Sequence, residues 1–208
     1  METPSSTIKV SALSEFKSIT KAGLAFSVVF STLAGYLLAV EDWQQIDFIK
    51  LIMLAVGGYC MVGASNAFNQ IIEKDLDAKM DRTKNRPISS GRMSKNTAFV
   101  LASALTVVGL IILYIVSPKT AMFGAISIFL YTSVYTPLKP LTPLAVFVGA
   151  FPGAIPFMLG WVAHTDQFGI EMRMRQGIIE PIYANSSNYT SSSHLNRSFM
   201  VGATYTFK

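Results

Sequence analysis

The stretch Asn69-Gln-Ile-Ile-Glu73-Lys-Asp-Leu-Asp77-Ala-Lys-Met80-Asp81-Arg82-Thr83-Lys-Asn-Arg86-Pro87 begins in the last turn of an apolar run that is long enough to cross a membrane. Asn69, Glu73 and Asp77 are four residues apart, so a helix would place them on one face, one above the other. Asp81 continues this row. The pattern predicts a membrane helix that ends in a polar site at the membrane boundary.

The composition also indicates a membrane protein. Of the 208 residues, 51% are apolar and only 14% are charged, and the mean hydropathy is +0.43. Soluble domains average roughly 25% charged residues. The single cysteine, Cys60, lies in an apolar run and has no partner for an internal disulfide. No nucleic-acid partner is expected.

Five apolar segments approach the length of about 20 residues that a helix needs to cross a bilayer. The predicted fold class is therefore an all-α integral membrane protein. Residues 1–21 precede the first span and are polar and mixed in charge, which is not typical of a cleaved signal peptide. The predicted spans are 22–40, 49–72, 97–116, 120–135 and 143–163.

The basic residues orient these spans. The N-terminal segment and the loops after the second and fourth spans hold eleven Lys and Arg residues, whereas the alternate loops hold only Lys50 and Lys119. Cytoplasmic loops carry the excess of basic residues. We therefore expect a multi-pass protein of the bacterial inner membrane, with a cytoplasmic N-terminus and the acidic row facing the cytoplasm.

The acidic row suits a magnesium-bound diphosphate. Magnesium prefers hard oxygen ligands and is usually held by one or two carboxylates together with substrate phosphates. Glu73 and Asp77 would supply the carboxylates, and Asn69 and Asp81 would supply further oxygens. Two arginines follow, Arg82 and Arg86, and their planar forks fit phosphate oxygens. The competing interpretation is a solvated helix end with i,i+4 ion pairs.

A second polar cluster closes the fourth span on the same side of the membrane. Lys139 would bind phosphate as a point charge, and Tyr135 would donate a hydrogen bond to it. The alternative is an interfacial tyrosine beside a lysine that reaches toward water. The fifth span carries Gly149, Gly153 and two prolines, at 152 and 156, which predict either a pocket or close helix packing.

These motifs resemble a known family. The Asn69-x-x-x-Glu73-x-x-x-Asp77 row resembles the first acidic motif of the UbiA-type intramembrane prenyltransferases, although many relatives carry Asp in place of Glu73. Within that superfamily the resemblance is to the heme O synthase (protoheme IX farnesyltransferase) branch. It covers about residues 15–171. The other matching segments are Met80-x-Arg-Thr-x-x-Arg-Pro87, Tyr135-Thr-Pro-Leu-Lys-x-x-Thr-Pro143 and Gly149-Ala-Phe-Pro-Gly-Ala-Ile-Pro-x-x-x-Gly-Trp161.

The resemblance implies a bundle of nine spans around a cavity open to lipid. Two acidic motifs would face each other at its cytoplasmic end and bind diphosphate through Mg2+. Asn69, Glu73 and Asp77 would be the catalytic motif, with Arg82, Arg86, Tyr135 and Lys139 near the diphosphate. The implied reaction transfers the farnesyl group of farnesyl diphosphate to a vinyl group of heme B, with membrane lipid as surroundings and heme A synthase as a candidate partner.

The resemblance ends near residue 171, so we expect residues 22–171 to form the prenyltransferase part and residues 172–208 to be an unrelated polar tail. Residues 199–207 alternate strictly, which predicts a strand and resembles the closing strand of a TonB-dependent outer-membrane receptor. The second acidic motif is then missing, so we expect a truncated prenyltransferase that is inactive alone.

Two other functions remain open from the sequence. One is a prenyltransferase of the same superfamily that acts on an aromatic quinone precursor, which the acidic row alone does not exclude. The other is a non-catalytic membrane fragment whose basic loop, with seven Lys and Arg residues between the second and third spans, binds anionic lipid.

Overall fold

The computed structural model describes residues 11–165, 170–178 and 195–203, with side chains for the first of these ranges. The chain divides into two compact units, Met1–Asp166 and Gln167–Lys208. The first unit contains every residue that the sequence predicts for the site. The two units are described separately.

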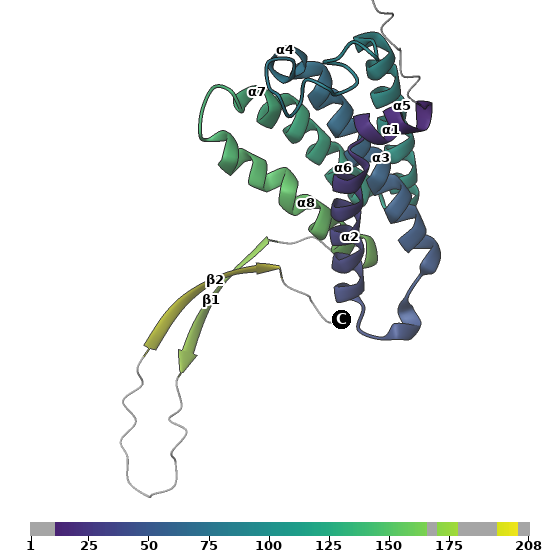
Figure 1. Ribbon diagram of the computed structural model, residues 1–208. Coiled ribbons are helices and arrows are strands. Elements are labelled where there is room, and N and C mark those ends of the chain that lie inside the picture. Colours follow the sequence, from purple (N-terminus) through teal and green to yellow (C-terminus); the bar gives the residue numbers. More distant parts are fainter. Residues whose placement is uncertain (1–10, 166–169, 179–194, 204–208) are drawn as a thin grey trace, which may run out of the picture. The chain divides into compact units, whose positions relative to one another are not determined.

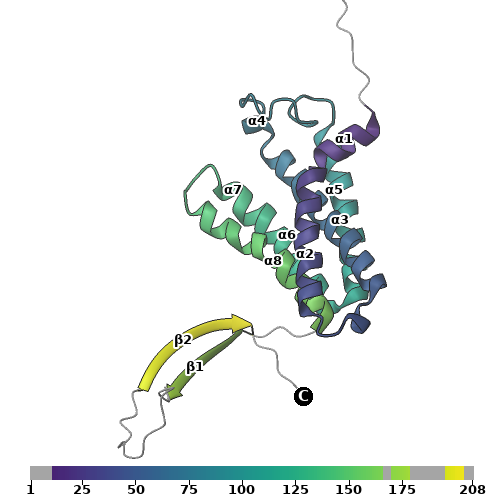
Figure 2. The same ribbon diagram turned by 60° about the horizontal axis from the view of Figure 1, so that its bottom comes forward.

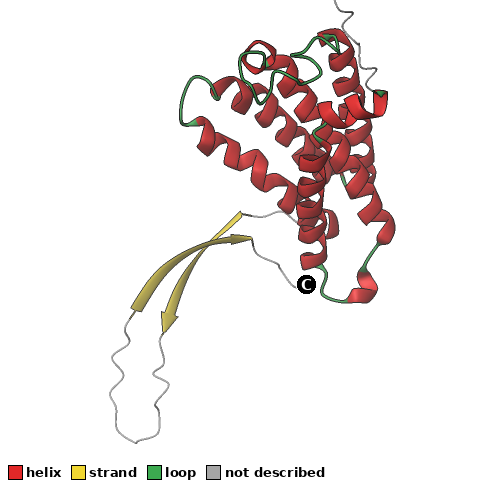
Figure 3. Ribbon diagram, viewed as in Figure 1, coloured by secondary structure: helices red, strands yellow, loops and turns green. Residues whose placement is uncertain are grey.

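In the described part of the first unit, helices joined by loops make up the secondary structure (Figures 1 and 3). Five stretches are long and apolar enough to cross a membrane, and they match the five predicted spans. The fourth stretch, Pro118–Leu138, is made of three consecutive helical elements, the middle one a π-helix. The elements are α1 Ala12–Ile19, α2 Ala22–Ala39, a 3-10 turn η1 Trp43–Gln45, α3 Phe48–Ile72, α4 Lys74–Asp77, α5 Lys95–Val116, α6 Pro118–Phe129, the π-helix η2 Leu130–Tyr135, α7 Thr136–Leu138 and α8 Ala145–Thr165.

Polar side chains fix where the long helices begin. Asp47 accepts hydrogen bonds from the backbone N–H groups of Ile49 and Lys50, at 2.9 and 3.1 Å, and so caps α3. Ser94 accepts from the N–H of Thr97 at 3.0 Å and caps α5. Such caps satisfy N–H groups that have no partner inside the helix. Both helices therefore start within two residues of the apolar runs that predicted them.

Glycines bring α2 and α8 into backbone contact. A Cβ atom on Gly35 would collide with the carbonyl of Phe157, and one on Gly160 would collide with the carbonyl of Thr32. The close approach expected of Gly149 and Gly153 is different. Gly149 faces the ring of Tyr135, and a Cβ on Gly153 would meet nothing within 4 Å. Gly35 and Gly160 therefore make the tight α2–α8 contact, and Gly153 lines open space.

The bundle is held together by α3 against α5 and by α2 against α8 and α3. Its largest buried apolar cluster includes Tyr36, Leu54, Met61 and Leu113. Many large apolar side chains point outward instead, among them Phe30, Val100 and Phe147. Exposed apolar surface on such long helices is what lipid contact requires. The chain is a multi-pass membrane protein.

One end of the bundle is polar. The short helices α1, α4 and α7 lie at this end in both views (Figures 1 and 2). Side chains of α3 link them, because Gln70 donates to the carbonyl of Ile19 at the end of α1 and Asn69 contacts Thr136 of α7. The polar end therefore gathers segments that are far apart in the sequence.

The second unit contains an antiparallel pair of strands, β1 Ile170–Ile178 and β2 Leu195–Ala203, with Ile170 opposite Ala203. The strand expected at 199–207 overlaps β2 up to residue 203, and residues 204–208 lie outside the described residues. The strand at 170–178 was not predicted from the sequence. The unrelated origin of residues 172–208 stays a prediction.

Candidate active site

The three residues of the acidic row stay aligned although α3 ends within the row. α3 ends at Ile72, yet the N–H of Glu73 donates to the carbonyl of Asn69 at 2.9 Å, and the N–H of Asp77 donates to the carbonyl of Glu73 at 2.8 Å. This i to i−4 pattern keeps the three side chains on one face through α4. All three are buried, with exposed fractions of 2% for Asn69, 6% for Glu73 and 1% for Asp77.

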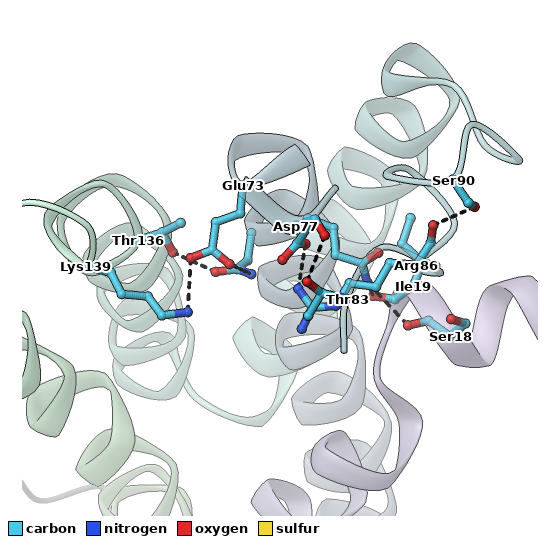
Figure 4. A network of polar contacts seen from close by, with 11 residues as sticks. Ser18, Ile19, Glu73, Asp77, Thr83, Arg86, Ser90, Thr136 and Lys139 are labelled. Atoms are coloured by element: carbon cyan, nitrogen blue, oxygen red, sulfur yellow. Dashed lines mark hydrogen bonds and ion pairs between the residues drawn. The ribbon is translucent and has the colours of Figure 1, made fainter. Parts of the chain in front are cut away.

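Glu73 is held by two different elements. Asn69 donates from its amide nitrogen to Oε2 at 2.9 Å, and Lys139 donates from Nζ to Oε1 at 3.1 Å (Figure 4). The hydroxyl of Thr136 lies 3.2 Å from the amide oxygen of Asn69 and fixes which way that amide faces. The lysine side chain keeps 52% of its surface exposed, so this ion pair is open to solvent.

Asp77 is more enclosed. Arg86 donates from a guanidinium nitrogen to Oδ2 at 2.6 Å, and Thr83 donates to the backbone carbonyl of Asp77 at 2.9 Å (Figure 4). The second carboxylate oxygen, Oδ1, is buried and has no hydrogen-bond partner within the described residues. Buried polar atoms are normally satisfied. This oxygen therefore marks a place where a ligand would gain a contact.

Two of the predicted site residues lie elsewhere. The structure places Asp81 with 98% of its side chain exposed, in an ion pair with Lys84 at 2.7 Å, and leaves Arg82 exposed. After Asp77 the chain leaves the helical path, because the N–H of Met80 bonds three residues back, to the carbonyl of Asp77. The fourfold spacing no longer aligns side chains there, so Asp81 is not brought to the row.

Tyr135 lies beside the row rather than in contact with it. Its ring packs against Gly149 of α8 and against the ring of Tyr131, with ring centroids 5.3 Å apart. Tyr135 lines a cavity of about 460 Å³ between α2, α3, the α6–η2 stretch and α8. Most lining residues are apolar, and Asn66 and Gly153 are among them. Gly149, Gly153 and the two prolines of the fifth span therefore line a pocket, which favours the pocket over close helix packing at these positions.

Sequence reasoning missed three residues of the site: Lys21, Thr83 and Thr136. Thr83 and Thr136 are buried hydroxyls whose partners come from the row itself. Lys21 interacts electrostatically with Glu73, Asp77, Arg86 and Lys139. The sequence did show that Lys21 is a basic residue directly before the first span, at a membrane boundary. Nothing in the sequence alone placed it beside α3.

The donor set fits magnesium only with help from a substrate. Among the residues that carry described side chains, no group of three His, Cys, Asp or Glu residues could hold a metal ion. Two buried carboxylates, one with an unpartnered oxygen, match the usual magnesium arrangement of one or two carboxylates plus phosphate oxygens. Asn69 contributes by holding Glu73.

The fold and site define a helical membrane protein with two buried carboxylates, each paired with a basic residue, at one end of its bundle. The model of the UbiA prenyltransferase family matches residues 28–183, and the chain belongs to this family. The matched range continues beyond residue 171, where the sequence resemblance was expected to end.

Similar curated proteins carry a more specific name. The chain is 72% identical over 161 residues to the protoheme IX farnesyltransferase of Flavobacterium psychrophilum, covering 77% of this chain and 54% of that protein. It is 69% identical over 157 residues to the protein of the same name from Flavobacterium johnsoniae, covering 76% and 52%. The chain thus spans about half the length of these relatives.

Two solved structures share the fold. A digeranylgeranylglyceryl phosphate synthase superposes with a TM-score of 0.67 at 18% identity, covering 73% of this chain and 53% of that one. A UbiA homologue from Archaeoglobus fulgidus bound to GPP and Mg2+ superposes with a TM-score of 0.65 at 12% identity, covering 76% and 56%. At identities this low, the superpositions show a common helical fold and nothing more specific.

Proposed function

We propose that this chain binds a prenyl diphosphate with Mg2+ at Glu73 and Asp77, and that its site serves farnesyl transfer to heme B. The name of the Flavobacterium relatives supports the farnesyl and heme parts of the proposal. The archaeal homologue bound to GPP and Mg2+ supports the diphosphate and metal parts. Heme A synthase as a partner follows only from the family resemblance.

The observation that carries the proposal is the buried pair of carboxylates at the polar end of the bundle. Asp77 keeps one buried oxygen without a partner, and Glu73 is paired with a lysine that stays half exposed. A buried charge is costly unless it is paired or binds metal. A prenyl diphosphate has a charged head and a greasy tail, which is the combination that this end of the bundle would accommodate.

Each side chain has a role in this arrangement. Glu73 and Asp77 would hold the ion, and Asn69 orients Glu73 through its 2.9 Å hydrogen bond. Arg86 and Lys139 already lie on the two carboxylates and would also meet phosphate oxygens as the head group enters. Tyr135 lies between two cavities, since it lines both the apolar cavity and a second cavity that Lys139 also lines.

When bound, Mg2+ would neutralise the departing diphosphate as a Lewis acid. Cleavage of the C–O bond leaves a farnesyl cation, the heme vinyl group attacks it, and water adds a hydroxyl to the new cation and releases a proton. The residues of this chain position the head group and stabilise its negative charge. The apolar cavity wall would keep water away from the prenyl chain.

Binding is the direct test, because it needs no turnover. The chain in phosphatidylcholine nanodiscs is titrated with farnesyl thiolodiphosphate, with and without Mg2+. We expect magnesium-dependent binding that the double variant E73Q/D77N loses. The exposed carboxylate of Asp75 on the same short helix gives the matched control D75N, which should bind like the unaltered chain. Equal binding by E73Q/D77N would overturn the proposal.

The cavity is tested separately from the head-group site. Gly153 lines the cavity and has open space around it, so G153L would fill part of the volume. We expect loss of farnesyl thiolodiphosphate binding with unchanged binding of inorganic diphosphate. G23L is the control, since Gly23 also has open space but does not line this cavity. Loss of both ligands in G153L would argue against a tail site here.

Acceptor and orientation need their own measurements. Heme B titrated into the nanodiscs should shift its Soret band, whereas a hydroxybenzoate that competes in its place would favour the quinone-precursor alternative.

For orientation, a cysteine at the exposed Asn85 should be inaccessible to an impermeant maleimide in intact spheroplasts. Labelling from outside would contradict a cytoplasmic site.

A further inference from the structure

The turn between α1 and α2 has an unusual backbone. Lys21 adopts φ 48° and ψ 59°, the left-handed region, and is the one non-glycine residue with positive φ among the described residues. Residues with a Cβ rarely adopt this conformation, and it persists only where the surrounding structure enforces it. The turn at Lys21 is therefore held in place by its neighbours.

Two buried amides of α3 hold the turn. Asn66 donates to the carbonyl of Thr20 at 2.9 Å, and Gln70 donates to the carbonyl of Ile19 at 3.0 Å. The exposed fractions of these amides are 2% and 0%. Figure 4 shows Ser18 and Ile19 in the same polar network as Asp77 and Arg86. The helix that carries the acidic row therefore also fixes the residue before Lys21.

Lys21 lies near the row, because α3, which leads into the row, holds the carbonyls of the two residues before it. It is half-buried and interacts electrostatically with both carboxylates, Glu73 and Asp77, and with both cations, Arg86 and Lys139. Within residues 11–165 no hydrogen bond or ion pair holds its ammonium group. Arg86 and Lys139, in contrast, each have a carboxylate partner. Among these three cations, Lys21 is the one without a carboxylate partner within residues 11–165.

The charges of the cluster do not balance. Lys21, Arg86 and Lys139 oppose only Glu73 and Asp77, which leaves an excess of positive charge at a partly buried site. Burial first, and the charge of Arg86 second, lower the pKa of Lys21 from 10.5 to about 8. The ammonium form is therefore less stable here than in water, and an added anion would relieve this cost.

We propose that Lys21 is a third phosphate-binding residue, which contacts the diphosphate head together with Arg86 and Lys139. This inference rests on the proposed function, because it needs a diphosphate at the acidic row. A lysine at a membrane boundary also contacts lipid phosphate in many proteins. The shared chemistry is a phosphate oxygen, and the two sources are separated by the lipid used in the test.

The test compares K21M with K17M in phosphatidylcholine nanodiscs. Methionine keeps the length of lysine and has a Cβ, so the backbone strain at position 21 stays the same. Lys17 is an exposed lysine of α1 and gives the matched control. The probe is inorganic diphosphate with Mg2+. We expect K21M to bind on the order of tenfold more weakly, the loss typical of one charge-assisted contact. K21R should recover binding, and K17M should be unchanged.

A second readout on the unaltered chain covers the case in which K21M does not fold. Acetylation of Lys21 at a fixed pH is followed by peptide mass spectrometry with and without magnesium diphosphate. Protection of Lys21, but not of Lys17, supports the proposal. Protection that appears only in phosphatidylglycerol nanodiscs, without diphosphate, assigns Lys21 to lipid and overturns it.

The outcomes separate this inference from the proposed function. If the unaltered chain binds diphosphate and E73Q/D77N does not, while K21M binds normally and Lys21 stays unprotected, Lys21 is not a ligand and the proposed site stands. If the unaltered chain binds no magnesium diphosphate, the proposed function fails and the role of Lys21 fails with it.

Discussion

Residues 69–77 and the turn that follows them, 78–81, continue one fourfold spacing of polar side chains, yet these side chains lie in different surroundings. Asn69, Glu73 and Asp77 are buried and joined to other elements, whereas Asp81 is almost fully exposed and pairs with Lys84, three residues further along the same loop. The difference begins where i to i−4 bonding gives way to tighter turns after Asp77. Fourfold spacing is informative only while the backbone stays helical.

The same contrast separates the two arginines that were predicted to bind phosphate. Arg86 returns to Asp77 and keeps only 21% of its side chain exposed, while Arg82 faces solvent. Thr83 contributes to this return by donating to the backbone carbonyl of Asp77. The loop therefore folds back on the row that it follows, and of the two predicted arginines it brings Arg86 to the row.

The largest expected effect compares D77N with D81N. D77N removes the carboxylate that has an unpartnered buried oxygen and leaves Arg86 without its ion pair. We expect magnesium diphosphate binding to fall roughly 100-fold, whereas D81N changes it by less than about twofold. Isothermal titration in nanodiscs measures both. A loss in D81N as large as in D77N would return Asp81 to the site.

The next comparison is R86M against R82M. Loss of Arg86 removes a cation from the buried carboxylate, and we expect diphosphate binding to weaken on the order of tenfold. R82M should bind normally because the side chain of Arg82 is exposed and away from the row. The same titration decides between them. Similar losses in both variants would mean that the loop binds phosphate as a diffuse basic surface.

A smaller effect is expected from E73D. The shorter side chain keeps the charge but moves it away from Asn69 and Lys139, which hold the two oxygens of Glu73 at 2.9 and 3.1 Å. We expect binding about three- to fivefold weaker, less than the loss of one full charge-assisted contact. Tighter binding by E73D would show that the site suits the shorter side chain.

The smallest effect is a pH dependence at Lys21. Because its pKa is lowered from 10.5 to about 8, the folded chain releases this proton at a lower pH than the unfolded chain. The contribution of this group to the free energy of unfolding therefore rises between about pH 8 and pH 10.5. Acetylation rates measured against pH should show Lys21 becoming reactive near pH 8 when folded. A midpoint near 10.5 in the folded chain would contradict the burial of Lys21.

Much of this protein was determined by its sequence. Hydrophobic length fixed the five spans, because a helix in lipid must satisfy its own backbone and cover about 30 Å. Asn69, Glu73 and Asp77 were predicted because helical spacing aligns them, and Lys139 because it closes a span on the same side. The family resemblance followed from the same residues, and the family match supports it.

Only the tertiary structure decided which charges meet. The charged residues of the site come from different segments, and no local pattern in the sequence indicates that residues 21 and 73 lie near each other. These residues are Lys21, Glu73, Asp77, Arg86 and Lys139. The structure brought Lys21 in through the amides of Asn66 and Gln70, and it left Asp81 and Arg82 outside because a turn replaced a helix. Periodicity describes one helix at a time, whereas a site is made where several helices end together.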